Sequence, residues 1–427
     1  MTTANANRRR FLALATGTLG GLCCPALRAA QAQRLSFIWW GSPERADLTQ
    51  RALNAFQASH PRLGIDTEYL DWLDYWQRFV ALVATRKTPD LIQMDYRYLK
   101  LYAENGVLMP LDAYLGGLLD IESFGRQNID ACRIDGRLYG VNLGINSTAA
   151  IVDSGSWLAA GVEPPAIGTS WEMFGSRCAA FAKGNKQQHR YATSDASGAP
   201  NVFESWLRQR GKGLFDREGR PGFNTEDAVE WFDYWARLRS FGGCIPADLH
   251  VLYRQSIQTS PLIRGYAALD FAHSNMLPGY QQLTTRPLDI TAYPVTDGGH
   301  PGHYYKPSQM LSIAADSRSA EPAVELANFL VMSPEAVRML GVDRGIPASS
   351  TMRKVLATQL DKVGQKTLDY IDNLAPLVGP LPPPPPQGAG EFAILFQNIG
   401  HEVAFKQLTP KKGGEKLFRE AVALLSQ

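Results

Sequence analysis

The chain has 427 residues and a formal net charge of +2, with 45% hydrophobic and 20% charged residues. The basic excess lies in residues 1–32, which hold four arginines and no acid, so the remainder has 39 basic and 41 acidic side chains. This balance gives no reason to expect nucleic acid or an anionic membrane as a partner. About 395 residues can bury a large core and suggest two domains.

Residues 1–32 have the organisation of an export signal. Three arginines at 8–10 precede a mild apolar run at 11–27, and Ala30-Gln31-Ala32 is a small-x-small cleavage site. The run is too short and too weakly apolar for a comfortable membrane span. The arginines followed by Phe-Leu resemble the twin-arginine signal, the alternative being an ordinary secretion signal. Either way we expect a periplasmic protein, and Cys23 lacks a convincing lipobox for a lipid anchor.

Three cysteines remain after the signal, namely Cys132, Cys178 and Cys244. An odd number without C-x-x-C spacing argues against a disulfide framework or a zinc site. At most one bridge can form, and Cys178–Cys244 is the pairing we consider.

The first hundred residues after the signal alternate in hydrophobic pattern. The pattern predicts strands at 35–39, 64–69 and 89–95, and helices at 46–59, 74–84 and 99–105. This β-α-β-α-β-α order predicts an α/β fold with a parallel sheet and helices on both faces.

The rest of the chain is more helical. Capping residues and periodicity predict helices at 170–182, 225–241, 319–332 and 334–340, strand-like segments at 266–272 and 288–295, and a final helix of mixed charge. Residues 379–388 read GPLPPPPPQG, which must be an extended polyproline II segment.

The order of several short motifs over residues 34–350 carries a resemblance. "NAFQASHP", "TPDLIQMD", "ENGVLMPLDAYL" and "DGRLYGVNLGINSTAAIVD" are followed by "AGVEPPAIGTSWEMF", "RGYAALDFAHSN", "SIAADSRSAEPAVELANFLVMSPEAVRML" and "RGIPAS". In this order they resemble the extracellular solute-binding proteins of carbohydrate ABC transporters, the large family that includes maltose-binding protein. Two of the segments look most like transporters for plant-cell-wall or other oligosaccharides.

The resemblance implies a two-lobed periplasmic-binding-protein fold of type II, in which the lobes close on ligand by hinge motion. It implies crossovers near 144–150, 288–294 and 332–334, an N-terminal lobe of 33–143 plus 291–333, and a C-terminal lobe of 144–290 plus 334–427. It also implies a monomer without cofactor or catalysis, with a carbohydrate ligand and the permease subunits of an ABC importer in the inner membrane as partners.

Sugars are bound by aromatic rings that pack on their C–H faces and by planar polar groups that meet their hydroxyls. In a parallel sheet the ligand lies beyond the carboxyl ends of the strands. Trp39 and Trp40 end the first predicted strand and point to opposite faces, and we favour Trp40, beside Gly41 and Ser42, as the ligand-facing ring. The alternative for both rings is core packing.

Further candidates lie at strand ends, in loops and near the hinge. They are Tyr75, Asp95, Tyr96, Arg97, Asn142, Asn146, Trp206, Phe271, His273, Asn275, Lys306 and Arg344. Their alternatives are helix capping for Asp95, helix core for Tyr75, turn stabilisation for the asparagines, and structural or surface roles for the rest. An acidic sugar would be favoured if Arg97, Lys306 and Arg344 reached the cleft together.

Two other functions stay open on the sequence. An exported glycosidase or lyase would need two carboxyl groups about 5–10 Å apart, and Asp71 with Asp74 is the only tempting pair. The chain has no nucleophile elbow, H-E-x-x-H or Walker motif in a useful context. A binding protein for polyamine, iron or phosphate is the third hypothesis, although the many aromatic residues favour sugar.

Overall fold

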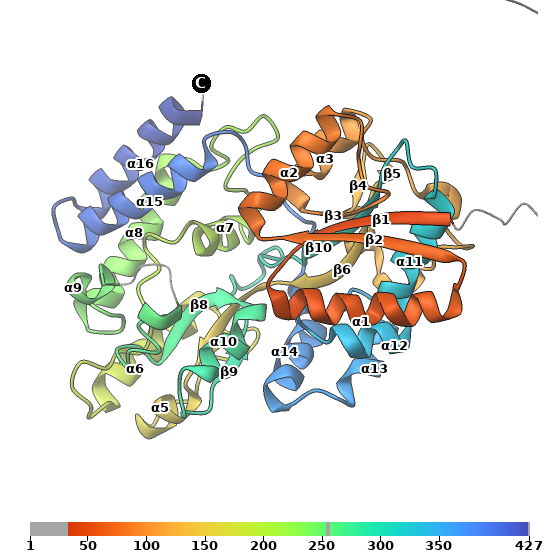
Figure 1. Ribbon diagram of the computed structural model, residues 1–427. Coiled ribbons are helices and arrows are strands. Elements are labelled where there is room, and N and C mark those ends of the chain that lie inside the picture. Colours follow the sequence, from red (N-terminus) through yellow and green to blue (C-terminus); the bar gives the residue numbers. More distant parts are fainter. Residues whose placement is uncertain (1–32, 253–256, 426–427) are drawn as a thin grey trace, which may run out of the picture.

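The computed structural model describes residues 33–252 and 257–425, so the expected export signal lies outside the described residues. The described chain forms two lobes, each with its own sheet and its own hydrophobic core (Figure 1). The expected α/β, two-lobed fold is confirmed.

The first lobe is built on a five-stranded sheet in the order β2-β1-β3-β10-β6. Its strands are β1 (Gln33–Trp40), β2 (Leu63–Leu70), β3 (Leu91–Met94), β6 (Val141–Asn146) and β10 (Lys306–Ile313). The first three are parallel, as expected, and β10 is antiparallel to both of its neighbours. The ends of β1–β3, the start of β10 and the end of β6 therefore share one edge of the sheet.

Helices cover both faces of this sheet (Figure 1). One face carries α1 (Pro43–Ser59), α11 (Ala320–Met332) and α12 (Pro334–Leu340), and the other carries α2 (Trp72–Ala84) and α3 (Tyr96–Glu104). Smaller elements complete the lobe: α4 (Arg126–Asp130), β4 (Arg133–Ile134), β5 (Arg137–Leu138), α13 (Ser350–Ala357) and α14 (Lys362–Asn373). With both faces covered, side chains of both strand orientations are buried.

The second lobe has a three-stranded antiparallel sheet with β7 (Thr148–Val152) between β8 (Leu269–His273) and β9 (Asp289–Thr291). Around it lie α5 (Ser154–Ala159), α6 (Trp171–Gly184), α7 (Pro200–Arg208), α8 (Thr225–Ser240), α9 (Ala247–His250), α10 (Leu277–Gln282), α15 (Ala389–Ala404) and α16 (Pro410–Leu425). Its core is rich in aromatic rings that meet edge to face, such as Trp171 with Trp231 and Trp231 with Trp235.

The crossovers between the lobes differ in part from those expected. We propose the first crossover between β6 and β7, because β6 belongs to the five-stranded sheet and β7 to the three-stranded one. The second lies later than 288–294, because His300 still bonds Gln209 of the second lobe and β10 begins only at Lys306. The third was expected near 332–334, but α12 packs on α1, and apolar residues up to Val378 belong to the first core.

The third crossover is instead the proline run, since Val378 is in the first core and Phe392 is in the second. On this packing we propose lobes of 33–146 plus 306–378 and of 147–303 plus 388–425. Helix α14 lies at the hinge side, where Tyr370 Oη donates to the carbonyl of Thr148 and Lys366 forms an ion pair with Asp289.

Cys132, Cys178 and Cys244 are buried free thiols, so the considered Cys178–Cys244 bridge is not formed. Burial in apolar surroundings raises the pKa of all three thiols, that of Cys132 to about 12, which keeps them protonated and unreactive. Within the two described segments we find no helix with the length and hydrophobicity needed to cross a membrane.

Candidate functional site

The strand ends of the first sheet meet the second lobe at the hinge. Lys306, at the start of β10, pairs with Asn146 at the end of β6, and His273, at the end of β8, pairs with Thr148. Burial, together with the nearby charge of Lys306, lowers the pKa of His273 to about 4. The structure thus brings three predicted residues, Asn146, His273 and Lys306, to one place between the lobes.

A polar cluster that the sequence analysis missed lies beside these residues. Tyr304 Oη donates a hydrogen bond to Glu204 Oε2 (3.1 Å), and the Arg208 guanidinium lies over the Tyr304 ring at 5.0 Å from its centroid. Burial raises the pKa of Glu204, while Arg208, the Tyr304 hydrogen bond and Lys306 act in the opposite direction. We refer to Glu204, Arg208 and Tyr304 as the hinge cluster.

The proline crossover runs past this cluster and is bonded to both lobes. From the second lobe, Arg208 Nη2 donates to the carbonyl of Pro380 (2.6 Å). From the first lobe, Tyr96 Oη donates to the carbonyl of Pro382 (2.8 Å). Burial raises the pKa of Tyr96 to about 12, so its hydroxyl stays protonated and able to donate this bond.

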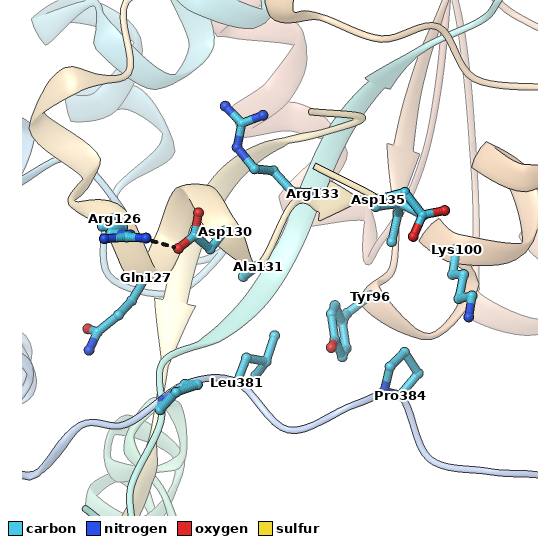
Figure 2. Close-up of a pocket in the computed structure, with 12 residues that line it drawn as sticks. Tyr96, Lys100, Arg126, Gln127, Asp130, Ala131, Arg133, Asp135, Leu381 and Pro384 are labelled. Atoms are coloured by element: carbon cyan, nitrogen blue, oxygen red, sulfur yellow. Dashed lines mark hydrogen bonds and ion pairs between the residues drawn. The ribbon is translucent and has the colours of Figure 1, made fainter. Parts of the chain in front are cut away.

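A cavity of about 540 Å³ lies between the crossover and the first lobe (Figure 2). It is lined by Tyr96, Lys100, Arg126, Gln127, Asp130, Ala131, Arg133, Ile134, Asp135, Pro380, Leu381 and Pro384. Figure 2 shows the crossover along one side of the cavity, with the Tyr96 ring facing it. Tyr96 and Pro380 belong both to this cavity and to the surroundings of the hinge cluster.

Trp40 does not offer its ring to a ligand in this structure. It is 7% exposed, and its ring packs edge to face on Trp72 and Tyr75, with centroids 5.0 Å apart in both pairs. Trp39 is buried as well. A half-buried ring at this edge is that of Trp72, the first residue of α2. The Arg97 guanidinium lies over this ring, 5.1 Å from its centroid.

Three other candidates at this edge have structural roles. Ser42 is the N-cap of α1 and accepts from the backbone N–H of Arg45 (3.3 Å). Asp95 is the N-cap of α3 and accepts from both the backbone N–H and the Nε of Arg97 (2.9 and 3.1 Å). Tyr75 is fully buried and donates to the carbonyl of Gln93. The capping and core alternatives therefore describe these side chains, and of the three Asp95 is half-buried.

Of four candidates further along the chain, three pack in the interior of a lobe and one is exposed. Asn142 is buried and accepts from the backbone N–H of Gly144 (3.2 Å). Trp206 is buried, with the Arg210 guanidinium stacked 3.4 Å from its ring centroid. Phe271 packs edge to face on Phe174, Trp235 and Tyr293 of the second core, while Asn275, two residues after His273, is exposed.

Arg344 points away from the other predicted cations. Its Nη2 donates to Thr49 Oγ1 (2.9 Å) on α1, and burial lowers its pKa to about 9. Lys306 is exposed at the hinge and Arg97 lies over Trp72. The three cations do not converge, so the arrangement that would have favoured an acidic sugar is absent from the described residues.

Local signals for the missed residues existed but were ambiguous. Glu204 and Arg208 are four residues apart on α7, opposite a face made of Phe203, Trp206 and Leu207. Charged residues at this spacing occur on any solvated helix face, so they did not stand out. Tyr304 lies two residues before Lys306 in "YYKP", and only the lysine of this motif was a predicted site residue.

Two sheet-based lobes with a polar hinge region between them define the class of two-lobed solute-binding proteins. The chain matches the family described as bacterial extracellular solute-binding protein over residues 51–362, and it belongs to this family. Such proteins bind solutes outside the cytoplasm and are not enzymes, which confirms both the resemblance and the expected lack of catalysis.

Solved structures and a curated relative support this assignment. An extracellular solute-binding protein family 1 member from Alicyclobacillus acidocaldarius is 29% identical, with a TM-score of 0.85, over 92% of this chain and 98% of that one. A periplasmic oligogalacturonide binding protein from Yersinia enterocolitica is 21% identical, with a TM-score of 0.77, over 92% and 99%. A putative binding protein of Brucella abortus is 21% identical over 181 residues, which are 41% of this chain and 42% of that protein's length.

Proposed function

We propose that the protein captures an oligosaccharide between its two lobes and delivers it to the permease of an ABC importer in the inner membrane. The observation that carries this proposal is the hinge cluster, in which a carboxylate and a guanidinium of the second lobe and a phenol of the segment before β10 lie near Tyr96 and Lys306 of the first lobe. These planar donors and acceptors suit sugar hydroxyls, each of which both donates and accepts.

The ligand would join the two lobes through this cluster. On the first lobe the proposed contacts are Trp72, Arg97, Tyr96 and Asn146, and on the second they are Glu204 and His273, with Tyr304 contributed by the segment between the lobes. A ligand stabilises the closed form only by the difference in its affinity for the two states. Contacts from both lobes supply that difference, since the open form can make only one set at a time.

The name of the Yersinia protein makes oligogalacturonides a reasonable first panel. The hinge cluster contains one cation, Arg208, and one carboxylate, Glu204, and Lys306 is close enough to act on the pKa of Glu204. One acidic unit could pair with Lys306, but Arg344 would not take part. Ligand length and charge are therefore variables of the experiment.

The experiment is calorimetric titration of the mature protein with neutral and acidic oligosaccharides, followed by mass analysis of the recovered sugar. Glu204→Gln removes the charge of the carboxylate and Tyr304→Phe removes the hydroxyl, and each should weaken binding about 10- to 100-fold, the range for hydrogen bonds that involve a charged group. Glu163→Gln, which changes an exposed carboxylate of the second lobe, is the matched control and should bind as wild type.

If a ligand has the same affinity for Glu204→Gln and for wild type, the hinge cluster is not part of the binding site. Binding of phosphate, iron or a polyamine without any sugar would replace the carbohydrate proposal. Recovery of cleaved sugar would contradict transport without chemistry.

A further inference from the structure

The cavity between the proline crossover and the first lobe has a composition that the hinge cluster does not explain. Several of its lining groups are apolar, namely the Tyr96 ring, Ala131 and Ile134 on the side of the first lobe and Leu381 and Pro384 on the side of the crossover. In Figure 2 charged side chains lie around these groups, on both sides of the Tyr96 ring. Its volume of about 540 Å³ is in the range of small-molecule sites.

The charges around the cavity are balanced in local pairs. Arg126 and Asp130 form an ion pair at 3.4 Å with side chains that are 92% and 55% exposed. Arg133 pairs with Asp112 (2.8 Å), and Lys100 with Glu104 (3.6 Å). Exposed pairs of this kind contribute little to stability, so their polar atoms can exchange partners with a ligand at low cost.

The presence of both acidic and basic side chains around the cavity determines which kind of ligand fits it. An anionic ligand would face the carboxylates of Asp130 and Asp135, and a cationic ligand would face Lys100, Arg126 and Arg133. A neutral polyhydroxy ligand meets neither conflict, because each hydroxyl can donate to a carboxylate and accept from a cation. The Tyr96 ring and the apolar wall suit the C–H face of a pyranose.

The position of the cavity links it to the hinge cluster. Tyr96 lines the cavity, and it is close enough to Tyr304 of the cluster for ionisation of one phenol to raise the pKa of the other. Pro380 lines the cavity and accepts a hydrogen bond from Arg208 of the cluster. A saccharide chain in the cleft therefore has a neighbouring space on the far side of the Tyr96 ring.

We propose that this cavity is an additional subsite, which takes a neutral pyranose unit at one end of the oligosaccharide bound in the cleft. This inference rests on the proposed function. The proline crossover forms its outer wall, so a unit in the subsite touches the first lobe and a segment that Arg208 holds to the second.

The test is calorimetric titration with a series of neutral oligosaccharides of increasing length, and with the same series ending in a uronic acid at either terminus. In wild type, one added neutral unit should raise the affinity by about tenfold, the effect of one or two net hydrogen bonds. Ile134→Trp fills the cavity and should remove this step while shorter ligands bind within about twofold of wild type. Ile394→Trp, at an exposed isoleucine of α15, is the matched control.

Lys100→Gln alters one exposed cation of the rim and keeps the test valid if Ile134→Trp does not fold. It should weaken only the longer ligands, by about threefold or more. The subsite would be overturned if one added neutral unit raised the affinity by the same factor in wild type and in a folded Ile134→Trp protein, or in wild type and in Lys100→Gln. A uronic acid that strengthens binding at the end affected by Ile134→Trp would overturn its neutral character. Failure of every sugar to bind wild type would instead refute the proposed function itself.

Discussion

Replacing Pro382–Pro386 with Gly-Ser-Gly-Ser-Gly removes the stiff part of the third crossover but keeps its length. The carbonyl of residue 382, which accepts from Tyr96, is still present in this variant, and so is that of Pro380, which accepts from Arg208. The change therefore isolates the rigidity of the segment from its hydrogen bonds. We expect a lower melting temperature and unchanged helix content.

The magnitude follows from the entropy of the unfolded chain. A proline whose native conformation is compatible with its ring stabilises a protein by about 0.4–1 kcal/mol, so five prolines contribute about 2–5 kcal/mol. For a chain of about 395 residues, an unfolding entropy of about 2.1 cal/mol/K per residue converts this to about 2–6 °C. Differential scanning calorimetry resolves a shift of this size.

An alanine version of the same segment is the matched control. Alanine keeps Cβ and is less flexible than glycine, so its melting temperature should lie between those of the other two proteins. If the glycine-serine protein melts within about 1 °C of wild type, the crossover does not restrain the fold, and the argument from proline stiffness is wrong.

Three further predictions concern stability. Burial lowers the pKa of His303 to about 4, so on acidification the unfolded chain binds a proton at a higher pH than the folded chain does. The resulting stabilisation, at most about 3 kcal/mol, is complete above pH 6.5 and is lost as the pH falls toward 4. In urea denaturation, His303→Asn should therefore show a stability that varies less with pH than that of wild type. Asp195→Ala leaves the arginine of its buried ion pair without its partner and should cost about 3–5 kcal/mol in chemical denaturation, whereas equal stability would show that water replaces the carboxylate. Gly144→Ala places Cβ against the backbone carbonyl of Arg344 and should cost about 1–3 kcal/mol, while Gly390→Ala, with open space around it on α15, should not lower the melting temperature.

Much of the fold followed from local patterns. The strands that became β1, β2 and β3 and the helices between them were predicted to within a few residues, because the hydrophobic periods of 2 and 3.6 are clear there. The crossovers were harder to predict. The apolar face of α12 fits a core in either lobe, and only the folded structure shows that it packs on α1.

The site was predicted less well, for a related reason. Alternation along β1 correctly places Trp39 and Trp40 on opposite faces, but helices cover both faces of this sheet, so both rings are buried. The ring at the rim, Trp72, starts the helix after the neighbouring strand. The hinge cluster joins α7 to the segment before β10, about 100 residues apart, and no local pattern reports that contact.

The proline crossover is the part of the molecule in which sequence, fold and proposed function meet. A polyproline II segment rises about 3.1 Å per residue without internal hydrogen bonds, so its carbonyls are free to accept bonds from neighbours. Here those neighbours come from opposite lobes, Tyr96 on one side and Arg208 on the other. A flexible loop would have to be ordered each time these bonds form, whereas the prolines are already extended. The same stiffness makes the segment a firm wall for the cavity in Figure 2. Under the proposed function, the position of that wall would follow the lobe that holds Arg208, so a ligand on the first lobe that contacts the wall would favour closure.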